Sequence, residues 1–428
     1  MNDLELSRIE AYRQLKNEIR GSKEYLIVGI DVAKSKHNAF FGTATGKSLL
    51  RRVAFENDME GFERLLLHVD AVKVEHALDQ VVFGLEPTAD YHKPLAEYLI
   101  KGGYRVVLVG GEAVKKNRVL LDGRWDKHDM KDSANVADLI SQGKCLHYDF
   151  PSIELRDLRN LLSLKRRLKK QEHGWKVRIR NHLLAQYFPE MDRYYGQSET
   201  QGLPIIRWCL NPDVVARLDF DSFIGLVAPQ CRMVQHRERL RMIWEKAGGS
   251  IGCEVGESVE FEARLSVEGL TQAQDAVREC KKKIEEICRG FPEYPCLLSI
   301  PGFGPDVSAK VLGAIGNPFR FHNGQQVLKL SGMDLSASRS GKRSDRAVPV
   351  ISKKGKAELR YALYQAALIA SVKNRHFKIY FTNRLRGRER EKGIKTKMRI
   401  KLAAKMLLIA WHLMKKQETF DPQYLNLH

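Results

Sequence analysis

The residues best placed for chemistry are acidic, and two of them belong to predicted strands. Asp31 lies inside the apolar pattern of residues 25–31, which predicts a buried strand. A carboxylate in that position costs free energy unless it is paired, hydrogen-bonded or bound to a cation; capping of a turn is the alternative role. Glu86 follows the predicted strand 80–85, and Pro87 cannot continue a central strand. Glu86 should therefore lie where the chain leaves the sheet.

Two further acids, Asp129 and Asp132, are three residues apart at the start of a predicted helix. This spacing places both carboxylates on one face, although acids in a first turn also suit a plain helix cap. With the strand acids, they supply the hard oxygen ligands that Mg²⁺ prefers. Two such ions can stabilise both the attacking and the leaving oxygen of a phosphodiester. The sequence thus predicts a metal site for phosphodiester chemistry at Asp31, Glu86, Asp129 and Asp132.

A candidate nucleophile, Ser340, lies far from these acids in a loop rich in Gly and Ser. Arg339 precedes it and Lys342 follows shortly after, so cations flank the hydroxyl on both sides. Such charges can stabilise an alkoxide and its phosphate partner. A flexible basic loop without a catalytic role explains the same pattern.

The composition predicts a polyanionic partner. The 428 residues carry a formal charge of +20, and such an excess of Lys and Arg most simply indicates nucleic acid. Hydrophobic residues at 43% and charged residues at 29% exclude a disordered chain. We find no signal peptide and no apolar run long enough to span a bilayer. The seven cysteines form no CxxC pair, which argues against a zinc ribbon and suits free thiols in a reducing cytoplasm.

Three segments are candidates for contacts with nucleic acid. Residues 152–191 predict a long basic helix or helical pair, typical of a coiled-coil arm that dimerises or grips phosphates, with a solvated helix face as the alternative. Residues 297–316 predict a helix-hairpin-helix whose glycines let backbone amides approach a phosphate, with a plain turn as the alternative. Residues 373–401 interleave aromatic and basic side chains, which suits single-stranded or structured nucleic acid. The predicted contacts are Arg166, Arg167, Lys169, Lys170, Gly302, Gly304, Arg339, Lys342, Lys353 and Lys354.

The predicted elements divide the chain into three domains. Strands alternate with helices in residues 1–150, which indicates an α/β sheet with sites at strand ends. Residues 151–290 are expected to be helical, with a helix at 271–288 that pairs with the earlier arm. Residues 291–428 are expected to be mainly helical. Within these domains we expect Asn57 to cap a helix, residues 115–118 to form a basic linker, and residues 196–275 to carry no readable chemistry.

A series of short motifs resembles one known family. In chain order they are GIDVAK at 29–34, GLEPT at 84–88, K-x-D-x-x-D at 127–132, a leucine- and arginine-rich arm at 155–184, IPGFGP at 300–305, SASRSGK at 336–342 and ISKKGKAELR at 351–360. The order and content of this set resemble the DEDD-type transposases of the insertion sequence 110 family, with its 1111 subgroup. Each motif alone is weak, but the set covers most of the chain.

The resemblance implies an RNase-H-like (RuvC-like) α/β domain, a helical coiled-coil insert and a C-terminal transposase domain with the helix-hairpin-helix. It implies that Asp31, Glu86, Asp129 and Asp132 bind metal and that Ser340 forms a covalent link to DNA. It also implies a structured non-coding guide RNA that selects donor and target DNA. The active site would be shared between subunits of a dimer or tetramer, in a prokaryotic cytoplasm and close to the nucleoid.

Three functions remain to be compared. The leading hypothesis is an RNA-guided DNA recombinase that uses Mg²⁺, or Mn²⁺ in its place, and the serine nucleophile. The first alternative is a Holliday-junction-type nuclease, in which metals activate water and Ser340 is structural. The second is a non-catalytic RNA- or DNA-binding protein.

Overall fold

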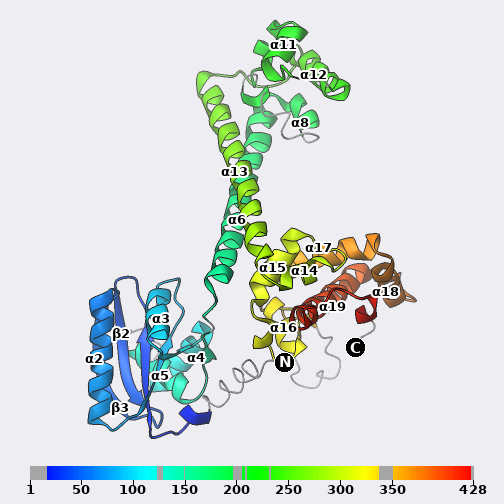
Figure 1. Ribbon diagram of the computed structural model, residues 1–428. Coiled ribbons are helices and arrows are strands. Elements are labelled where there is room, and N and C mark those ends of the chain that lie inside the picture. Colours follow the sequence, from blue (N-terminus) through cyan, green and yellow to red (C-terminus); the bar gives the residue numbers. More distant parts are fainter. Residues whose placement is uncertain are drawn as a thin grey trace. The chain divides into compact units, whose positions relative to one another are not determined.

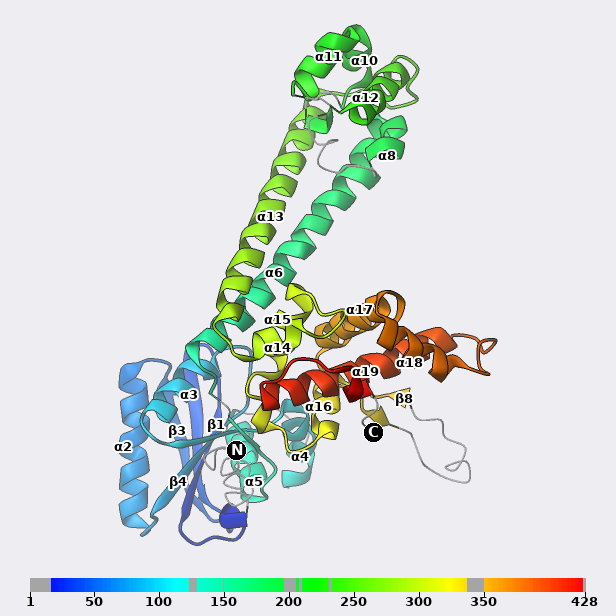
Figure 2. The same cartoon turned by 45° about the vertical axis from the view of Figure 1, so that its right-hand side comes forward.

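The structure, a computed structural model, has two compact units (Figures 1 and 2). One comprises Met1–Ser152 with Phe319–His322, and the other comprises Ile153–Pro318 with Asn323–His428. The first is a mixed α/β fold and the second is mostly helical. The residues described are 17–122, 129–148, 150–195, 205–207, 210–230, 233–336 and 350–425.

The first unit is built on a six-stranded sheet in the order β3-β2-β1-β4-β5-β6. Antiparallel pairing joins β1 to β2 and β2 to β3, whereas β1, β4 and β5 run parallel and β6 is antiparallel to β5. The carboxyl ends of the parallel strands therefore meet at one edge, with β1 near the centre. The strands are β1 (Tyr25–Asp31), β2 (Lys36–Thr43), β3 (Ser48–Glu56), β4 (Gln80–Leu85), β5 (Arg105–Leu108) and β6 (Leu146–His147).

Helices cover both faces of this sheet, and β1 is buried between them. Leu26, Val28 and Ile30 pack into a hydrophobic cluster with one pair of helices, while Tyr25 and Ile27 pack into a second cluster on the opposite face. This alternation follows from the two-residue period of a strand. The first face is covered by α2 (Met59–Glu75) and α3 (His92–Lys101), and the second by α4 (Gly111–Asp122) and α5 (Asp129–Ser141).

Two local predictions in this unit are wrong. The segment expected to be a basic linker is part of helix α4, which is anchored by the buried side chain of Val114. The N-cap of α2 is Asp58, whose carboxylate accepts a hydrogen bond from the Gly61 amide at 2.8 Å. Asn57 instead donates its side-chain amide to the Lys34 carbonyl at 3.1 Å. The predicted ranges of β1 and β4 are confirmed.

The second unit contains a pair of long helices, α6 (Ile153–Arg178) and α13 (Glu257–Arg289), which lie side by side in both views (Figures 1 and 2). A π-helical segment at Ile179–Leu184 and the short α7 (Ala185–Tyr187) continue α6. Helix α13 begins fourteen residues before the predicted start at 271. Its buried positions recur every three or four residues, as expected for a helix that packs along one stripe. They include Ala263, Val267, Leu270, Ala273, Val277, Cys280, Ile284 and Cys288.

At one end of this pair, short helices surround a hydrophobic cluster that includes Phe188, Phe223 and Leu240. Most of this region is the stretch in which the sequence showed no motif. Two helices follow residue 211, and Asp219 caps the second one by accepting hydrogen bonds from the amides of Asp221 and Ser222. The helices are α8 (Pro189–Tyr195), α10 (Pro212–Arg217), α11 (Phe220–Val227) and α12 (Val234–Ala247).

A helical bundle follows α13 in the sequence. Its centre is the contact between α17 and α19, in which Leu363, Ala366 and Ala367 of α17 and Leu402 and Met406 of α19 are almost completely buried. The elements are α14 (Glu293–Leu298), α15 (Pro305–Ile315), a 3₁₀ turn (Pro318–Arg320), α16 (Gly324–Ser331), β7 (Leu335–Ser336), β8 (Val350–Ile351), α17 (Ala357–Lys373), α18 (Arg375–Leu385), α19 (Ile394–Lys416) and a last 3₁₀ turn (Pro422–Leu425).

Within the described ranges, no helix combines the length and the apolar character needed to cross a membrane. The cysteines that fall in those ranges are free thiols: Cys145, Cys253, Cys280, Cys288 and Cys296.

Candidate active site and nucleic-acid interfaces

The sheet brings Asp31 and Glu86 to the same edge. Ile30 of β1 is the register partner of Leu85 of β4, and the two strands run parallel. The next residue along each strand is therefore the acid, at the same level of the sheet. Because Ile30 and Leu85 both pack into the cluster under α2 and α3, strand alternation places both acids on the opposite face, which α5 covers. Both side chains are partly exposed.

The middle and last turn of α5 lie against these strands two residues before each acid. Gly29 and Gly84 are register partners. A Cβ on Gly29 would lie 2.3 Å from the carbonyl oxygen of Ser133 and 2.5 Å from the amide nitrogen of Ala137. A Cβ on Gly84 would lie 1.9 Å from Cδ1 of Ile140. Both strands thus share the pattern of a glycine, an apolar residue and an acid. The glycine, which has no Cβ, lets α5 pack closely against the strand.

Helix α4 begins beside Glu86. A Cβ on Gly111, the first residue of α4, would lie 2.9 Å from Oε1 of Glu86. The free amides at the start of a helix favour a negative charge nearby. The start of α4 therefore brings the positive end of a helix dipole close to the carboxylate of Glu86. The sequence did not indicate this contact, because α4 was not predicted.

Asp132 has a defined partner within the same unit. Its side chain is 2% exposed, and its Oδ1 accepts a hydrogen bond from Nε of Arg118 at 2.7 Å. Arg118 extends from α4 and is itself only 18% exposed. This is a buried ion pair, which satisfies a charge that would otherwise be costly in the interior. The sequence contained Arg118 but gave no sign of this pairing.

The four predicted carboxylates are oxygen ligands of the kind that a divalent cation binds, but the structure brings only some of them together. Asp31 and Glu86 offer hard oxygen ligands at one edge, and Asp129 is the first residue of α5. The side chain of Asp129 lies outside the described residues. Among those that are described, no group of three or more His, Cys, Asp or Glu side chains could hold a metal ion. The four-carboxylate metal site stays a prediction.

The predicted serine loop lies outside the described residues, as do Ser340, Arg339 and Lys342. The strands on either side of it in sequence, β7 and β8, pair antiparallel, with Leu335 opposite Ile351. Just after β8, Lys353 adopts a left-handed backbone with φ of 56°, which is uncommon for a residue with a side chain. Its amide donates to the carbonyl of Gly332 at 3.0 Å. The exposed Lys353 and Lys354 thus follow a fixed turn.

The predicted phosphate contacts on α6 are all exposed: Arg166, Arg167, Lys169 and Lys170. Two of them have carboxylate partners, since Arg166 pairs with Glu358 at 3.2 Å and Lys169 pairs with Glu172 at 2.7 Å. Lys170 has no ion-pair or hydrogen-bond partner among the described residues. The positive charge of this helix is therefore partly balanced within the unit.

The turn between α14 and α15 is the predicted hairpin. Gly302 has a φ of 91°, and a Cβ there would lie 2.5 Å from the carbonyl oxygen of Ala366 in α17. This glycine therefore has a packing role as well as a turn conformation. Gly304 caps α15 and has open space around it. In the first turn of α15, the carboxylate of Asp306 pairs with Lys165 and, at 2.8 Å, with Lys310. Contacts of Gly302 and Gly304 with phosphate stay predictions.

The Asp306 ion pair predicts a pH dependence of stability. Burial alone would raise the pKa of Asp306, but the two lysines outweigh it and hold the pKa below its ordinary value of 3.8. A carboxyl whose pKa is lowered by folding stabilises the protein above its unfolded pKa, and this contribution is lost as the pH falls through the folded pKa. We expect Asp306→Asn to lower the free energy of unfolding at pH 7 by about 1 kcal/mol, because the Asp306 side chain is 47% exposed and solvent screens its pairs. The difference from wild type should begin to shrink near pH 3.8. Urea unfolding monitored by circular dichroism at several pH values would measure it, and a pH-independent difference would contradict the assignment.

Comparison with known proteins identifies the family. A transposase family model of the DEDD IS110 type matches residues 28–189. A second model, described as "Transposase IS116/IS110/IS902 family", matches residues 294–382. A protein of Streptomyces coelicolor, described as "Insertion element IS110 uncharacterized 43.6 kDa protein", is 23% identical over 327 residues, which cover 74% of this chain and 77% of the relative. The two models match in order, together cover more than half of the chain, and agree with this relative: the chain belongs to the IS110 family of transposases.

Proposed function

We propose that this transposase is an RNA-guided DNA recombinase with a metal-binding acidic site and a serine nucleophile. The observation that carries the proposal is the register of β1 and β4, which places Asp31 and Glu86 side by side on the face covered by α5. A central acid-bearing strand, flanked by an antiparallel hairpin on one side and parallel strands on the other, supports an RNase-H-like (RuvC-like) assignment for the first unit. The paired α6 and α13 support the coiled-coil assignment.

In this proposal, Asp31, Glu86, Asp129 and Asp132 hold Mg²⁺ or Mn²⁺, which supplies positive charge to the scissile phosphate. The chain's residues provide the positions: parallel strands fix Asp31 and Glu86, and the start of α5 carries the other two acids. The Ser340 oxygen attacks the phosphorus of one DNA strand. A serine–phosphate bond forms as the phosphodiester bond breaks, and the leaving strand keeps its oxygen as a hydroxyl that accepts the serine proton. That hydroxyl can later reverse the step on a different strand.

The partners follow from the charge and the family. A net charge of +20 and exposed cations on α6 and after β8 support binding of donor DNA, target DNA and a structured guide RNA. We propose that the acidic unit of one subunit faces the serine loop of another, in a dimer or tetramer. Sequencing of RNA that co-purifies with the protein expressed from its own element tests the guide RNA: one discrete, element-encoded RNA is expected, and random cellular RNA would refute it.

The serine step has a direct test. The purified protein is incubated with its RNA, Mg²⁺ and DNA carrying the element's junction, and the products are resolved on a denaturing protein gel. Wild type should give a covalent protein–DNA adduct, and Ser340→Ala should give none. Ser338→Ala is the matched control, because it alters a neighbouring serine of the same loop and should preserve the adduct.

The other outcomes of this assay separate the alternatives. Cleaved DNA without an adduct would indicate a Holliday-junction-type nuclease in which the metals activate water. An unchanged adduct in Ser340→Ala would assign the nucleophile to another residue. Binding with neither cleavage nor adduct would indicate a non-catalytic nucleic-acid-binding protein.

A further inference from the structure

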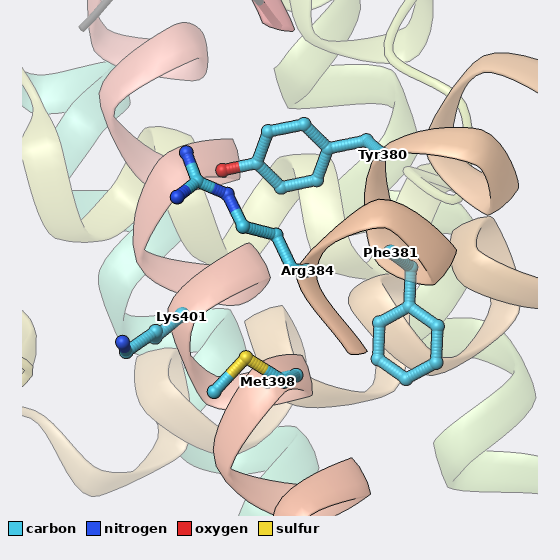
Figure 3. Close-up of a pocket in the computed structure, with 5 residues that line it drawn as sticks. All are labelled: Tyr380, Phe381, Arg384, Met398 and Lys401. Carbon is cyan, nitrogen blue, oxygen red and sulfur yellow. The ribbon is translucent and has the colours of Figure 1, made fainter. Parts of the chain in front are cut away.

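Helices α18 and α19 form a small pocket that combines aromatic and cationic side chains. Its volume is about 180 Å³, below the roughly 300 Å³ at which pockets for drug-sized ligands begin. In Figure 3, the charged ends of the α18 arginine and the α19 lysine extend to the same side of the pocket. The residues that line this α18–α19 pocket are Tyr380, Phe381, Arg384, Met398 and Lys401.

Among the described residues, no acid serves as a counter-ion for the cations of the pocket. Residues 373–401 contain twelve Lys and Arg but only two acids, Glu389 and Glu391. Both acids are engaged close to themselves in sequence: Glu391 pairs with Arg388 at 2.7 Å, and Glu389 accepts a hydrogen bond from the Gly387 amide. In the part of the chain that the structure describes, no carboxylate pairs with either pocket cation. The pocket therefore presents unbalanced positive charge.

Lys405 adds to this charge one helical turn beyond Lys401, on the same face of α19. Burial lowers its pKa, and the neighbouring charge of Arg384 lowers it further. Two neighbouring cations without a carboxylate between them repel each other, and the binding of an anion lowers their electrostatic free energy. A phosphate at this position would relieve the repulsion.

Planar groups in the pocket and beside it are arranged for stacking. The guanidinium of Arg384 lies over the Tyr380 ring at 5.4 Å, and that of Arg399 lies over the Phe381 ring at 5.5 Å. Nε of Arg399 is buried without a hydrogen-bond partner among the described residues. Aromatic rings and guanidinium planes are the surfaces on which proteins stack unpaired bases.

We propose that the α18–α19 pocket binds one unpaired nucleotide of a nucleic-acid strand, with its base against Arg384 and Tyr380 and its phosphate near Lys401 and Lys405. The volume suits a single base rather than a longer segment. A base in duplex DNA is stacked and paired, so only a single-stranded, looped or extruded nucleotide can enter. The inference rests on the proposed function in one respect, namely that the chain binds nucleic acid.

The test compares the affinities of the full-length protein for single-stranded DNA, stem-loop RNA and duplex DNA by fluorescence anisotropy. Tyr380→Ala and Arg384→Lys remove a stacking surface, and the second retains the charge. Each should weaken binding of an unpaired strand about tenfold while changing duplex affinity less than twofold. Tyr380→Phe, which keeps the ring, should bind like wild type. Comparison of the losses for stem-loop RNA and for single-stranded DNA shows whether RNA or DNA supplies the nucleotide.

The matched control is Lys378→Ala, an exposed cation of α18 that does not line the pocket. It should weaken the binding of all three ligands equally. It should also reduce the slope of log affinity against log salt concentration by about 1. Equal losses for duplex and unpaired strands in the pocket variants, or no loss, would overturn the pocket assignment while leaving nucleic-acid binding intact. Failure of the wild type to bind any of the three ligands would overturn nucleic-acid binding itself, and with it the proposed function.

Discussion

Replacement of either strand acid, by Asp31→Asn or Glu86→Gln, should reduce DNA strand cleavage by on the order of 10³-fold, the upper range for loss of one electrostatic stabiliser of a transition state. Both substitutions keep the side-chain volume and remove the negative charge. The two acids occupy equivalent ends of parallel strands, so we expect similar losses from both. Rates of junction-DNA cleavage under single-turnover conditions measure the effect.

The control for this pair is Asp79→Asn, which removes a charge from an exposed residue just before β4. It should cleave at the wild-type rate. DNA affinity should be nearly unchanged in all three variants, because the removed charges are negative and do not contact phosphate directly. Wild-type cleavage by Asp31→Asn would contradict the acidic site altogether, whereas cleavage lost only together with DNA affinity would indicate a folding defect.

Gly29→Ala should destabilise the first unit by about 3 kcal/mol, the upper range for overpacking of a core. The added methyl would lie 2.3 Å from the Ser133 carbonyl oxygen and 2.5 Å from the Ala137 amide nitrogen. Both are backbone atoms of α5, so no side-chain rotation relieves the clash. The helix itself must shift, and it carries Asp129 and Asp132 at its start.

Two other glycines make this prediction sharp. Gly84→Ala meets side-chain atoms of Ile140 and Val136 rather than backbone, and side chains can rotate, so its effect should be smaller. Gly110→Ala meets no atom within 4 Å and should change stability by less than 0.5 kcal/mol. Amide hydrogen exchange of peptides from β1 and α5 measures the relative destabilisation of the three glycine variants. Equal protection in Gly29→Ala and Gly110→Ala would show that α5 does not pack as closely as the structure has it.

The strands that carry the acids could be predicted because their signals are local. Continuous apolar runs define β1 and β4, and Pro87 ends the second strand. The structure confirms both predicted ranges. The approach of Asp31 to Glu86 was not fully predictable, since it depends on the parallel register of strands more than fifty residues apart. The shared spacing of glycine, apolar residue and acid in both strands is a signal that could have indicated it.

The missed elements share a physical cause. Helix α4 was taken for a linker because its many charges hide the buried apolar side chain that anchors it, Val114. The first half of α13 was missed because its buried face includes small residues, Ala263 and Ser266, which give a weak apolar signal. The pairing of Arg118 with Asp132 depends on the packing of two helices and has no counterpart in local sequence.

That ion pair has a consequence for handling the protein. Carboxylates gathered at one site repel each other when no metal is bound, and many small domains whose folding depends on a metal unfold in chelators. Here the guanidinium of Arg118 acts as an internal counter-ion for Asp132, so the most buried of the described carboxylates of the proposed site is neutralised by the chain itself. The first unit should therefore fold and remain stable in EDTA, so that metal can be added at will to start the reaction.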